Sequence, residues 1–429
     1  MNEAIAVGIF AVTLVSIFLE KWHRVVVSAL GASAMVLAGH IRGFFNEETA
    51  IEAVEFETIA LLLSMMIIIS LFRRTGFFEY LAIKVAQYSS GSFVRLMLML
   101  GVTTSLLSMV LDNVTTIVLM SPMIVLIAEL MGVSPIPLLI SQAIFSNVGG
   151  MATLVGDPPN ILIGSASHLT FIDFLVKMGP ITLAIWAAAY LVFRYLFRGY
   201  RVSAGGENRH ALTHLSAPEA LTDPANARRL FIVLTGVIVL FFMESTLHLA
   251  PAFTAFTGAA IALAWTQFDI HETLADVEWD VLLFFTALFV LVGGLEGAGV
   301  LEKITEVIFE FQDISPVLLG LIIMWAMVVL SALVDNIPIT IAVIPIILSL
   351  GARGMNTTPL WWAIALGAGL GGNATPIGST ANVLVISLSE RTEHPITARQ
   401  WLAHGVPVVV ASTVVASIMY IVLFDFLSA

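Results

Sequence analysis

The sequence contains no cysteine. Thiolate metal sites, covalent thiol chemistry and disulfides are therefore excluded. Charged side chains are also scarce, because they make up only 11% of the 429 residues, against about 25% in a typical soluble domain. The formal net charge is −12, and this argues against nucleic acid as a partner.

Catalytic and cofactor motifs are missing as well. The chain has no G-x-x-x-x-G-K-[ST] phosphate-binding loop, so it does not look like an ATPase. His271-Glu272 is not followed by a second histidine four residues on, so no zinc-binding helix is predicted. No arrangement of serine, histidine and aspartate suggests a hydrolase. We therefore predict that the protein is not an enzyme and that it holds no cofactor and no metal.

Long apolar segments are abundant, and 59% of the residues are hydrophobic. Val25–Ile41, Ile314–Val334 and Gly354–Ser389 contain no charged residue. Each is long enough to cross a hydrocarbon core of about 30 Å. The first apolar segment lacks the basic start and the small-residue cleavage site of a signal peptide, so we expect it to be retained as a span. The predicted fold class is an all-α polytopic membrane protein.

An internal repeat organises the chain. The matching segments lie 222 or 223 positions apart: Glu55-Phe56-Glu57 with Glu278-Trp279-Asp280, Asp112-Asn113-Val114 with Asp335-Asn336-Ile337, Gly149–Thr153 with Gly371–Thr375, and Gly156 and Asn160 with Gly378 and Asn382. Several matches in order at a near-constant offset predict two homologous halves, at residues 1–200 and 229–429. A polar stretch at 201–228, rich in Gly and Pro, is predicted to join them as a cytoplasmic linker.

Each half is predicted to have the same layout. Three scaffold spans come first, near 4–20, 24–41 and 56–72 in the first half and near 229–246, 253–268 and 279–295 in the second. The transport elements follow, at 92–197 and 315–427. They comprise two apolar arms that flank the Asp-Asn pair, an apolar segment broken by a Gly-rich stretch, and a closing span.

The arms around each Asp-Asn pair fit either two full spans or a re-entrant hairpin. Polar, helix-breaking residues at mid-depth are tolerated only when they are buried in protein or line a cavity, and this favours hairpins. Each half then crosses the membrane five times, and an odd number of crossings inverts the second half relative to the first. The prediction is two inverted-topology repeats with about ten transmembrane helices, two re-entrant hairpins and two discontinuous helices.

The basic residues predict the orientation. With both termini outside, all but four of the 18 lysine and arginine residues fall on the cytoplasmic side, and the exceptions are Arg42, Lys177, Lys303 and Arg353. The acidic loop Asp269–Asp280 is also assigned to the inside. Because the rule counts basic residues, that loop weakens the prediction only slightly.

The two Asp-Asn pairs are the first candidate site. A carboxylate within a membrane segment is costly and marks function by default. The alternative interpretation is a helix N-cap, in which Asp112 or Asp335 satisfies free backbone N–H groups. Both can hold together, since a buried capping carboxylate can also change its protonation state. We therefore predict ion binding and proton coupling at Asp112 and Asp335.

The Gly-rich breaks are the second candidate site. An unwound helix exposes backbone groups and two half-helix ends, which can bind ions and small polar solutes. An ordinary Gly/Pro turn between helices is the alternative. Asp157 has no carboxylate counterpart, because Ser379 occupies the matching position, and it is expected either to bind a coupling cation or to cap the following half-helix. The predicted substrate- and ion-binding residues are Asp112, Asn113, Thr115, Thr116, Asn147, Thr153, Asp157, Asn160, Asp335, Asn336, Asn373, Thr375, Ser379 and Asn382.

At Asp112–Thr116 and Ser146–Asn160 the sequence resembles the ion transporter superfamily, specifically its branch of arsenite efflux permeases and P-protein-like transporters. The resemblance covers nearly the whole chain, because the second-half motifs also fit. It implies a scaffold domain and a transport domain that moves by an elevator-like mechanism. It also implies hairpin tips at Asp112–Thr116 and Asp335–Thr340, and unwound loops at Gly149–Asn160 and Gly371–Asn382.

The tips depart from some members of that superfamily. Dicarboxylate transporters carry Ser-Asn-Thr there, whereas this chain has Asp-Asn, and two tip carboxylates would repel a dicarboxylate. Sodium/proton antiporters share an Asp-Asn-x-Thr-Thr tip, although their later loop differs from Gly-Asp-Pro-Pro-Asn.

The leading hypothesis is arsenite or antimonite efflux by proton antiport. Trivalent arsenic at neutral pH is mostly the uncharged trihydroxide, which neutral Asn, Thr and backbone groups would suit. A sodium/proton antiporter and an anion transporter or channel are the alternatives. We expect a bacterial or archaeal cytoplasmic (inner) membrane location. The expected partners are this small inorganic solute, protons or sodium, the lipid bilayer and, as a possible homodimer, a second copy of the chain.

Overall fold

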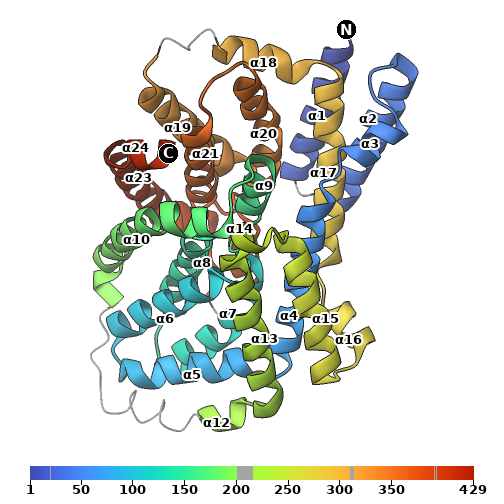
Figure 1. Cartoon of the computed structure of the whole chain (residues 1–429). Coiled ribbons are helices and arrows are strands. Elements are labelled where there is room, and N and C mark those ends of the chain that lie inside the picture. Colours follow the sequence, from blue (N-terminus) through green and yellow to red (C-terminus); the bar gives the residue numbers. More distant parts are fainter. Residues whose placement is uncertain (20, 201–215, 310–313, 391, 393) are drawn as a thin grey trace.

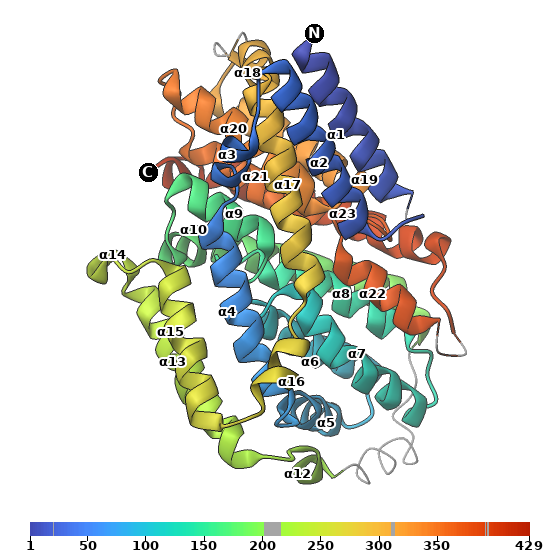
Figure 2. The same cartoon turned by 90° about the vertical axis from the view of Figure 1, so that its right-hand side faces the viewer.

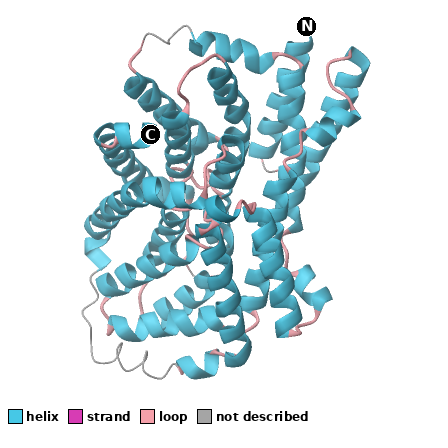
Figure 3. Cartoon of the chain, in the orientation of Figure 1, coloured by secondary structure: helices cyan, strands magenta, loops and turns pink. Residues whose placement is uncertain are grey.

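The computed structural model describes residues 1–19, 21–200, 216–309, 314–390, 392 and 394–429. All regular structure in these ranges is helical (Figure 3). Eight helices in these ranges are long and apolar enough to cross a membrane: α2 (Arg24–Arg42), α4 (Phe56–Arg73), α7 (Asn113–Leu130), α10 (Phe171–Leu196, continued by the 3-10 helix η1 at Phe197–Tyr200), α13 (Pro224–Phe242), α17 (Trp279–Gly297), α19 (Pro316–Leu333) and α23 (Ala398–Val422). The predicted all-α class agrees with this structure.

Shorter helices complete the molecule. The apolar ones are α1 (Asn2–Phe18), α6 (Phe93–Ser108), α8 (Ile136–Gly150), α15 (Pro251–Thr266), α20 (Asn336–Ala352), α21 (Thr358–Gly371) and α22 (Thr380–Ser389). The others are α3 (Glu47–Glu52), α5 (Phe77–Ser89), α9 (Pro158–Ser167), α12 (Ala217–Ala220), α14 (Glu244–Leu247), α16 (Ile270–Ala275), α18 (Val300–Phe309) and α24 (Phe424–Ser428).

Helix length does not separate the predicted spans from the predicted hairpin arms. The spans expected near 4–20 and 253–268 are α1 and α15, with 17 and 16 residues. The predicted hairpin arms α7 and α19 have 18 residues each. They are therefore slightly longer than the predicted spans α1 and α15. The assignment of arms and spans therefore depends on where the polar residues lie.

The helices form two groups. The first, called the scaffold group here, comprises α1, α2, α4, α13, α15 and α17. Within it α1 packs on α2, α2 on α17, α4 on α15 and α15 on α13 (Figure 2). The second, the transport group, comprises α6–α10 and α19–α23 and lies beside the scaffold group (Figure 1). The scaffold helices α4 and α17 contact α9 and α20 of the transport group.

The two halves cross inside the transport group. The broken segment of the first half is α8 and α9, separated by residues 151–157, and that of the second half is α21 and α22, separated by residues 372–379. The half-helix α9 packs on α20 of the second half, and α22 packs on α7 of the first half. Four helix N-termini, those of α7, α9, α20 and α22, are brought together in this way.

The breaks require glycine where backbone segments touch. A Cβ atom on Gly156 would lie 2.5 Å from the carbonyl oxygen of Ser108 and 2.7 Å from that of Gly150. In the second half, Gly378 would meet the Gly372 carbonyl oxygen at 2.7 Å. The matched glycines of the repeat are therefore explained by close backbone approach.

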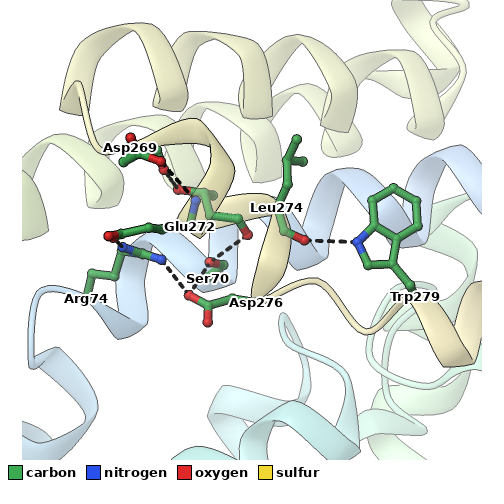
Figure 4. Close-up of polar contacts among 8 residues, drawn as sticks. Ser70, Arg74, Asp269, Glu272, Leu274, Asp276 and Trp279 are labelled. Atoms are coloured by element: carbon green, nitrogen blue, oxygen red, sulfur yellow. Dashed lines mark hydrogen bonds and ion pairs between the residues drawn. The ribbon is translucent and has the colours of Figure 1, made fainter.

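An ionic brace fixes the end of α4 to α16. Arg74 contacts Glu272 at 2.6 Å and Asp276 at 2.9 Å (Figure 4). The hydroxyl of Ser70, one turn earlier on α4, also donates to Asp276 at 3.2 Å. Because α17 begins just after Asp276, the brace fixes where the start of α17 lies relative to α4.

Part of the predicted linker is described. Residues 216–223 contain α12, which packs on α5, and the Asp223 N–H donates to the Thr75 carbonyl at 3.3 Å. Residues 224–228 of the predicted linker belong to α13 instead, because Asp223 caps this helix by accepting from the Asn226 N–H and Pro224 begins it. Residues 201–215 of the predicted linker lie outside the described residues, and so do Arg201, Arg209 and Arg391 of the topology prediction.

Candidate functional site

Polar side chains gather where the four helix N-termini meet. Asp112, Asp157, Asp335 and Ser379 are the N-cap residues of α7, α9, α20 and α22. The N-terminal end of a helix carries a partial positive charge. Three carboxylates are thus placed at three such ends, which offsets part of the cost of removing them from water.

The capping interpretation is correct for the two tips. Asp112 accepts a hydrogen bond from the Thr115 backbone N–H at 2.9 Å, and Asp335 accepts one from the Ile337 N–H at 3.3 Å. Both residues also lie at cavities, so a capping role and a binding role are compatible. Asp157 differs, because its side chain makes no cap hydrogen bond to α9.

A small closed pocket of about 20 Å³ lies at this junction. Its polar lining residues are Arg24, Asp112, Asn113, Asp157, Glu278, Asn336, Ser379 and Thr380. A volume of this order holds one water molecule. Five residues of the predicted set, Asp112, Asn113, Asp157, Asn336 and Ser379, are therefore brought together here.

Asp157 is the central acid of the closed pocket and is only 1% exposed. Its Oδ1 accepts from the amide of Asn113 at 3.3 Å and from the amide of Asn336 at 3.4 Å. These two asparagines are matched positions of the repeat, so each half donates once. Asp157 Oδ2 is buried and has no partner among the described residues. A buried oxygen with no partner is costly, and a bound proton, cation or polar solute would satisfy it.

Asn147 links the two halves behind the pocket. Its Oδ1 accepts from Asn113 at 2.8 Å and from the Ser379 hydroxyl at 3.3 Å. Its Nδ2 donates to Asn373 at 2.8 Å and to Asn382 at 3.4 Å. This network consists of neutral groups and carries no charge of its own.

Five predicted residues donate to backbone carbonyls and do not line the closed pocket; four of them hold the breaks in place. Asn160 donates to the Thr153 carbonyl at 2.8 Å, and Asn382 donates to the Thr375 carbonyl at 2.9 Å. Thr153 and Thr375 donate to the Met109 and Ala332 carbonyls at 2.5 and 2.6 Å. The fifth is Thr116, which donates to the Asp112 carbonyl at 2.9 Å. Their contacts position the site.

A larger cavity of about 690 Å³ adjoins the closed pocket. Its polar lining includes Lys21, His23, Arg24, Glu278, Asp280, Asp335, Thr380 and Ser387. Arg24, Val114, Glu278 and Thr380 line both spaces. These four residues form the boundary between the large cavity and the closed pocket.

Two boundary residues come from the scaffold group, and sequence reasoning did not find them as site residues. Glu278 is the N-cap of α17, and its Oε1 lies 3.4 Å from the Thr115 hydroxyl. Arg24 begins α2 and donates to the Thr380 hydroxyl at 2.8 Å. The Glu55/Glu278 match in the repeat was the one signal that pointed to Glu278.

The site has more acids than bases. Asp112, Asp157 and Glu278 line the closed pocket, with Arg24 as its cationic side chain. Within the described ranges, no group of three or more His, Cys, Asp or Glu side chains could hold a metal ion. The geometry suits protons, small cations or uncharged polar solutes better than a free polyanion.

Comparisons with known proteins show the family to which the chain belongs. The model of the CitMHS family, described as citrate transporters, matches residues 14–367 and 343–426. The chain belongs to this family. The protein is thus a multi-pass membrane transporter of the ion transporter superfamily and not an enzyme.

Several relatives match over nearly the whole chain. The 46 kDa membrane protein of Mycobacterium leprae is 34% identical over 97% of both chains. An uncharacterised transporter of Mycobacterium tuberculosis H37Rv has the same identity and coverage. The P protein of Sus scrofa is 30% identical over 96% of this chain and 58% of its own length.

A solved transporter structure also resembles the fold. The Alcanivorax borkumensis YdaH transporter aligns with a TM-score of 0.57 over 88% of both chains, at 18% sequence identity. The superfamily predicted from the two motifs is confirmed, and its P-protein-like part agrees with these relatives. The arsenite-permease assignment stays a prediction.

Proposed function

We propose that the protein is a proton-coupled secondary transporter that exports a small uncharged oxyacid, with arsenite or antimonite as the leading substrate. The observation that carries the proposal is Asp157. It is buried, it receives one amide from each half on one oxygen, and its second oxygen has no partner. That oxygen can accept either a proton or a hydroxyl donor of the solute.

The charge of the site supports an uncharged solute. Three carboxyl groups and one guanidinium line the closed pocket, and the network behind it consists of asparagine amides and a serine hydroxyl. Neutral donors and acceptors bind a trihydroxide by hydrogen bonds. The family description names citrate, but a free tricarboxylate would face the repulsion of these carboxylates at short range.

The two groups of helices suggest how transport proceeds. In the proposed topology, α6–α7 and α19–α20 are re-entrant hairpins, and ten membrane crossings in two inverted repeats complete the chain. The transport group would slide against the scaffold group in an elevator-like movement and expose the junction of the four N-termini to either side in turn. The large cavity at Arg24 and Glu278 would then be the opening to the cytoplasm.

A sodium/proton antiporter is the second candidate. Asp157 is 1% exposed, its Oδ2 has no partner among the described residues, and it lines the pocket of about 20 Å³ together with Asp112. These observations favour the antiporter, because a small cation would fit that volume and an oxyacid requires the pocket to open. In the first candidate arsenite or antimonite drives proton movement, and in the second candidate sodium drives it.

The test uses purified protein in liposomes that contain a pH-sensitive dye. Arsenite, antimonite, sodium and citrate are added separately under an imposed pH gradient. We expect proton movement with arsenite or antimonite and none with sodium alone. Proton movement with sodium alone would replace this proposal by the antiporter, and movement with citrate alone would replace it by a citrate carrier. Liposomes without protein, and the Glu129→Gln variant at an exposed position of α7, serve as controls.

A further inference from the structure

Two threonine hydroxyls connect the scaffold group to the starts of α7 and α20. Thr115 lies between Asp112 and Glu278, with its Oγ1 2.6 Å from Asp112 Oδ2 and 3.4 Å from Glu278 Oε1. Thr380 lies between Asp335 and Arg24, with its Oγ1 3.1 Å from Asp335 Oδ2 and 2.8 Å from the guanidinium. One acid of each half is thus joined through a hydroxyl to a scaffold side chain, which is an acid for Asp112 and a base for Asp335.

The hydrogen-bonded series Asp112–Thr115–Glu278 is one hydrogen short when both carboxyl groups are ionised. A threonine hydroxyl carries one hydrogen and can donate it to one acceptor at a time. The ionised forms of Asp112 and Glu278 are acceptors only, so the two carboxylates compete for the hydrogen of Thr115. If one carboxyl group is protonated, it donates to Thr115 and Thr115 donates to the other. One added proton completes the chain.

The hydrogen-bonded series Arg24–Thr380–Asp335 has a hydrogen for each of its bonds without an added proton. Arg24 donates to the Thr380 oxygen, and the Thr380 hydroxyl donates to ionised Asp335. Arg24 is itself held on the scaffold by Asp280 at 3.4 Å and by the ring of Phe284, whose centroid is 5.4 Å from the guanidinium carbon. The guanidinium remains charged at all relevant pH values, so it serves as a fixed counter-charge for Asp335.

We propose that the coupling proton is shared by Asp112 and Glu278 through Thr115, whereas Asp335 stays ionised opposite Arg24. The inference deepens the proposed proton antiport. It adds Glu278 as a proton-coupling residue and separates two aspartates that the repeat makes equivalent in sequence.

The proposed proton path is short. Glu278 lines both the large cavity and the closed pocket, so it can take a proton from the cavity. Protonated Glu278 donates to Thr115, which donates to Asp112. When the proton moves on, Glu278 gives its hydrogen to the Thr115 oxygen and Thr115 gives its own to Asp112. Glu278 ends ionised and Asp112 ends protonated, so charge and hydrogens balance.

The charged and titratable groups that line the closed pocket or the large cavity with Glu278 are Asp112, Asp157, Asp280, Asp335, Arg24, Lys21 and His23. Arg73 and Asp276 line an adjoining small cavity together with Glu278 and Thr115, and Asp276 is paired with Arg74. Including Glu278, six carboxyl groups thus face four lysine and arginine side chains. A single proton on the pair therefore brings the cluster closer to neutrality.

The repeat offers a matched control. Glu55 occupies the position of Glu278 in the first half as the N-cap of α4, and it lines neither the closed pocket nor the large cavity. Thr115→Val removes the bridging hydroxyl at nearly constant volume, and Thr115→Ser keeps it.

The experiment records infrared difference spectra of the full-length protein in lipid between pH 5 and pH 8, without any solute. We expect the wild type to show one protonated-carboxyl band, separate from those of Asp157 and of exposed carboxyl groups, that is lost in Glu278→Gln and in Asp112→Asn. It should be retained in Glu55→Gln, Asp335→Asn and Thr115→Ser. Retention of the band in Glu278→Gln, or its loss in Asp335→Asn, would overturn the proposal. If Glu278→Gln does not fold, the Thr115 variants decide: the proposal requires loss of the band in Thr115→Val and its presence in Thr115→Ser, and a band in both would overturn it.

A transport measurement separates this inference from the proposed function. Glu278→Gln should lower arsenite-driven proton movement about tenfold, as expected for about 1.4 kcal/mol of lost coupling, while exchange of labelled for unlabelled arsenite continues. Equal proton movement in Glu278→Gln and Glu55→Gln would overturn the inference and leave the proposed function standing. A wild type that moves no protons with arsenite, yet shows the Glu278 band, would overturn the proposed function alone.

Discussion

Asn336 of the second half donates a hydrogen bond to Asp157 of the first half across 3.4 Å. Its repeat counterpart, Asn113, donates to the same oxygen from the other side at 3.3 Å. The carboxylate therefore has symmetric donors, although it has no symmetric partner of its own, because Ser379 stands at the matched position. One half supplies the acid, and both halves supply the amides that hold it.

The first prediction concerns this acid. Asp157→Asn keeps the side-chain shape and one oxygen that can accept from Asn113 and Asn336, so the protein should fold. The replaced oxygen becomes an amide that can no longer accept a proton. Because a mispaired buried polar group costs about 1–3 kcal/mol, we expect transport in the dye-loaded liposomes to fall by about tenfold or more. Glu129→Gln should transport as the wild type does. Full activity of Asp157→Asn would remove Asp157 from the mechanism.

A second prediction concerns the crossing of backbones at the break in the first half. A methyl group on Gly156 would collide with the carbonyl oxygens of Ser108 and Gly150, which are backbone atoms and cannot rotate away. We expect Gly156→Ala to lower stability by about 1–3 kcal/mol and to reduce transport, because the break positions Asp157. Melting in detergent measures the stability.

The matched control is Gly236→Ala. Gly236 lies in the middle of α13, with no proline beside it, and an added Cβ there would meet no atom of another element within 4 Å. Alanine is the better helix former by up to about 1 kcal/mol, so this variant should melt at the same temperature as the wild type or slightly higher. If both variants melted alike, the close-approach explanation for Gly156 would be wrong.

The sequence predicted the centre of the site because the repeat marks it. The pair Asp112-Asn113 in the first half is matched by Asp335-Asn336 in the second half. Further along each half, the helix-breaking glycines and prolines also match. A polar residue that recurs in an apolar context has few structural explanations. Those residues therefore led to the closed pocket, and the interruption of α8–α9 and α21–α22 followed from the glycines and prolines.

The remainder of the site depends on contacts between segments far apart in the chain. Arg24 and Glu278 are 254 positions apart, both begin scaffold helices, and nothing in their local sequence distinguishes them from interfacial charges. The roles of Thr153, Asn160, Thr375 and Asn382 were also not predictable. A neutral donor beside a helix break can bind either a solute or the free carbonyls of the break. In this structure Asn160 and Asn382 donate to carbonyls of the breaks. Thr153 and Thr375 donate to carbonyls at the ends of α6 and α19.

A third prediction concerns pH and the short helix α16, next to the ionic brace of Figure 4. Asp269 accepts from the Glu272 backbone N–H at 3.0 Å, and this hydrogen bond lowers the pKa of Asp269 below its ordinary value. A carboxyl group whose pKa is lowered by folding adds stability above its unfolded value, and that stability is lost as the pH falls through the folded value. At pH 7 both Asp269→Asn and Asp269→Ala should melt below the wild type, with the alanine variant lower because it lacks a cap.

Acidification should close the gap between the wild type and Asp269→Asn, since protonated aspartate and asparagine are both neutral caps. Melting curves of the two proteins in detergent between pH 7 and pH 3 measure this gap. A gap that stays constant over that range would show that the charge of Asp269 does not stabilise α16.

The last prediction tests the inverted topology, and the absence of cysteine makes the test simple, because single cysteines can be introduced into the natural chain. Ser134 lies in the connection between α7 and α8, and Asn356, 222 positions later, lies in the connection between α20 and α21. In inverted repeats, matched positions face opposite sides of the membrane. We expect a membrane-impermeant maleimide to label Asn356→Cys in intact cells, and to label Ser134→Cys only in inside-out vesicles. Tyr88→Cys, at a side chain 68% exposed on α5, should label with Ser134→Cys from the cytoplasmic side. Labelling of Ser134→Cys and Asn356→Cys from one side would mean that the halves run parallel, and the inverted topology would be wrong.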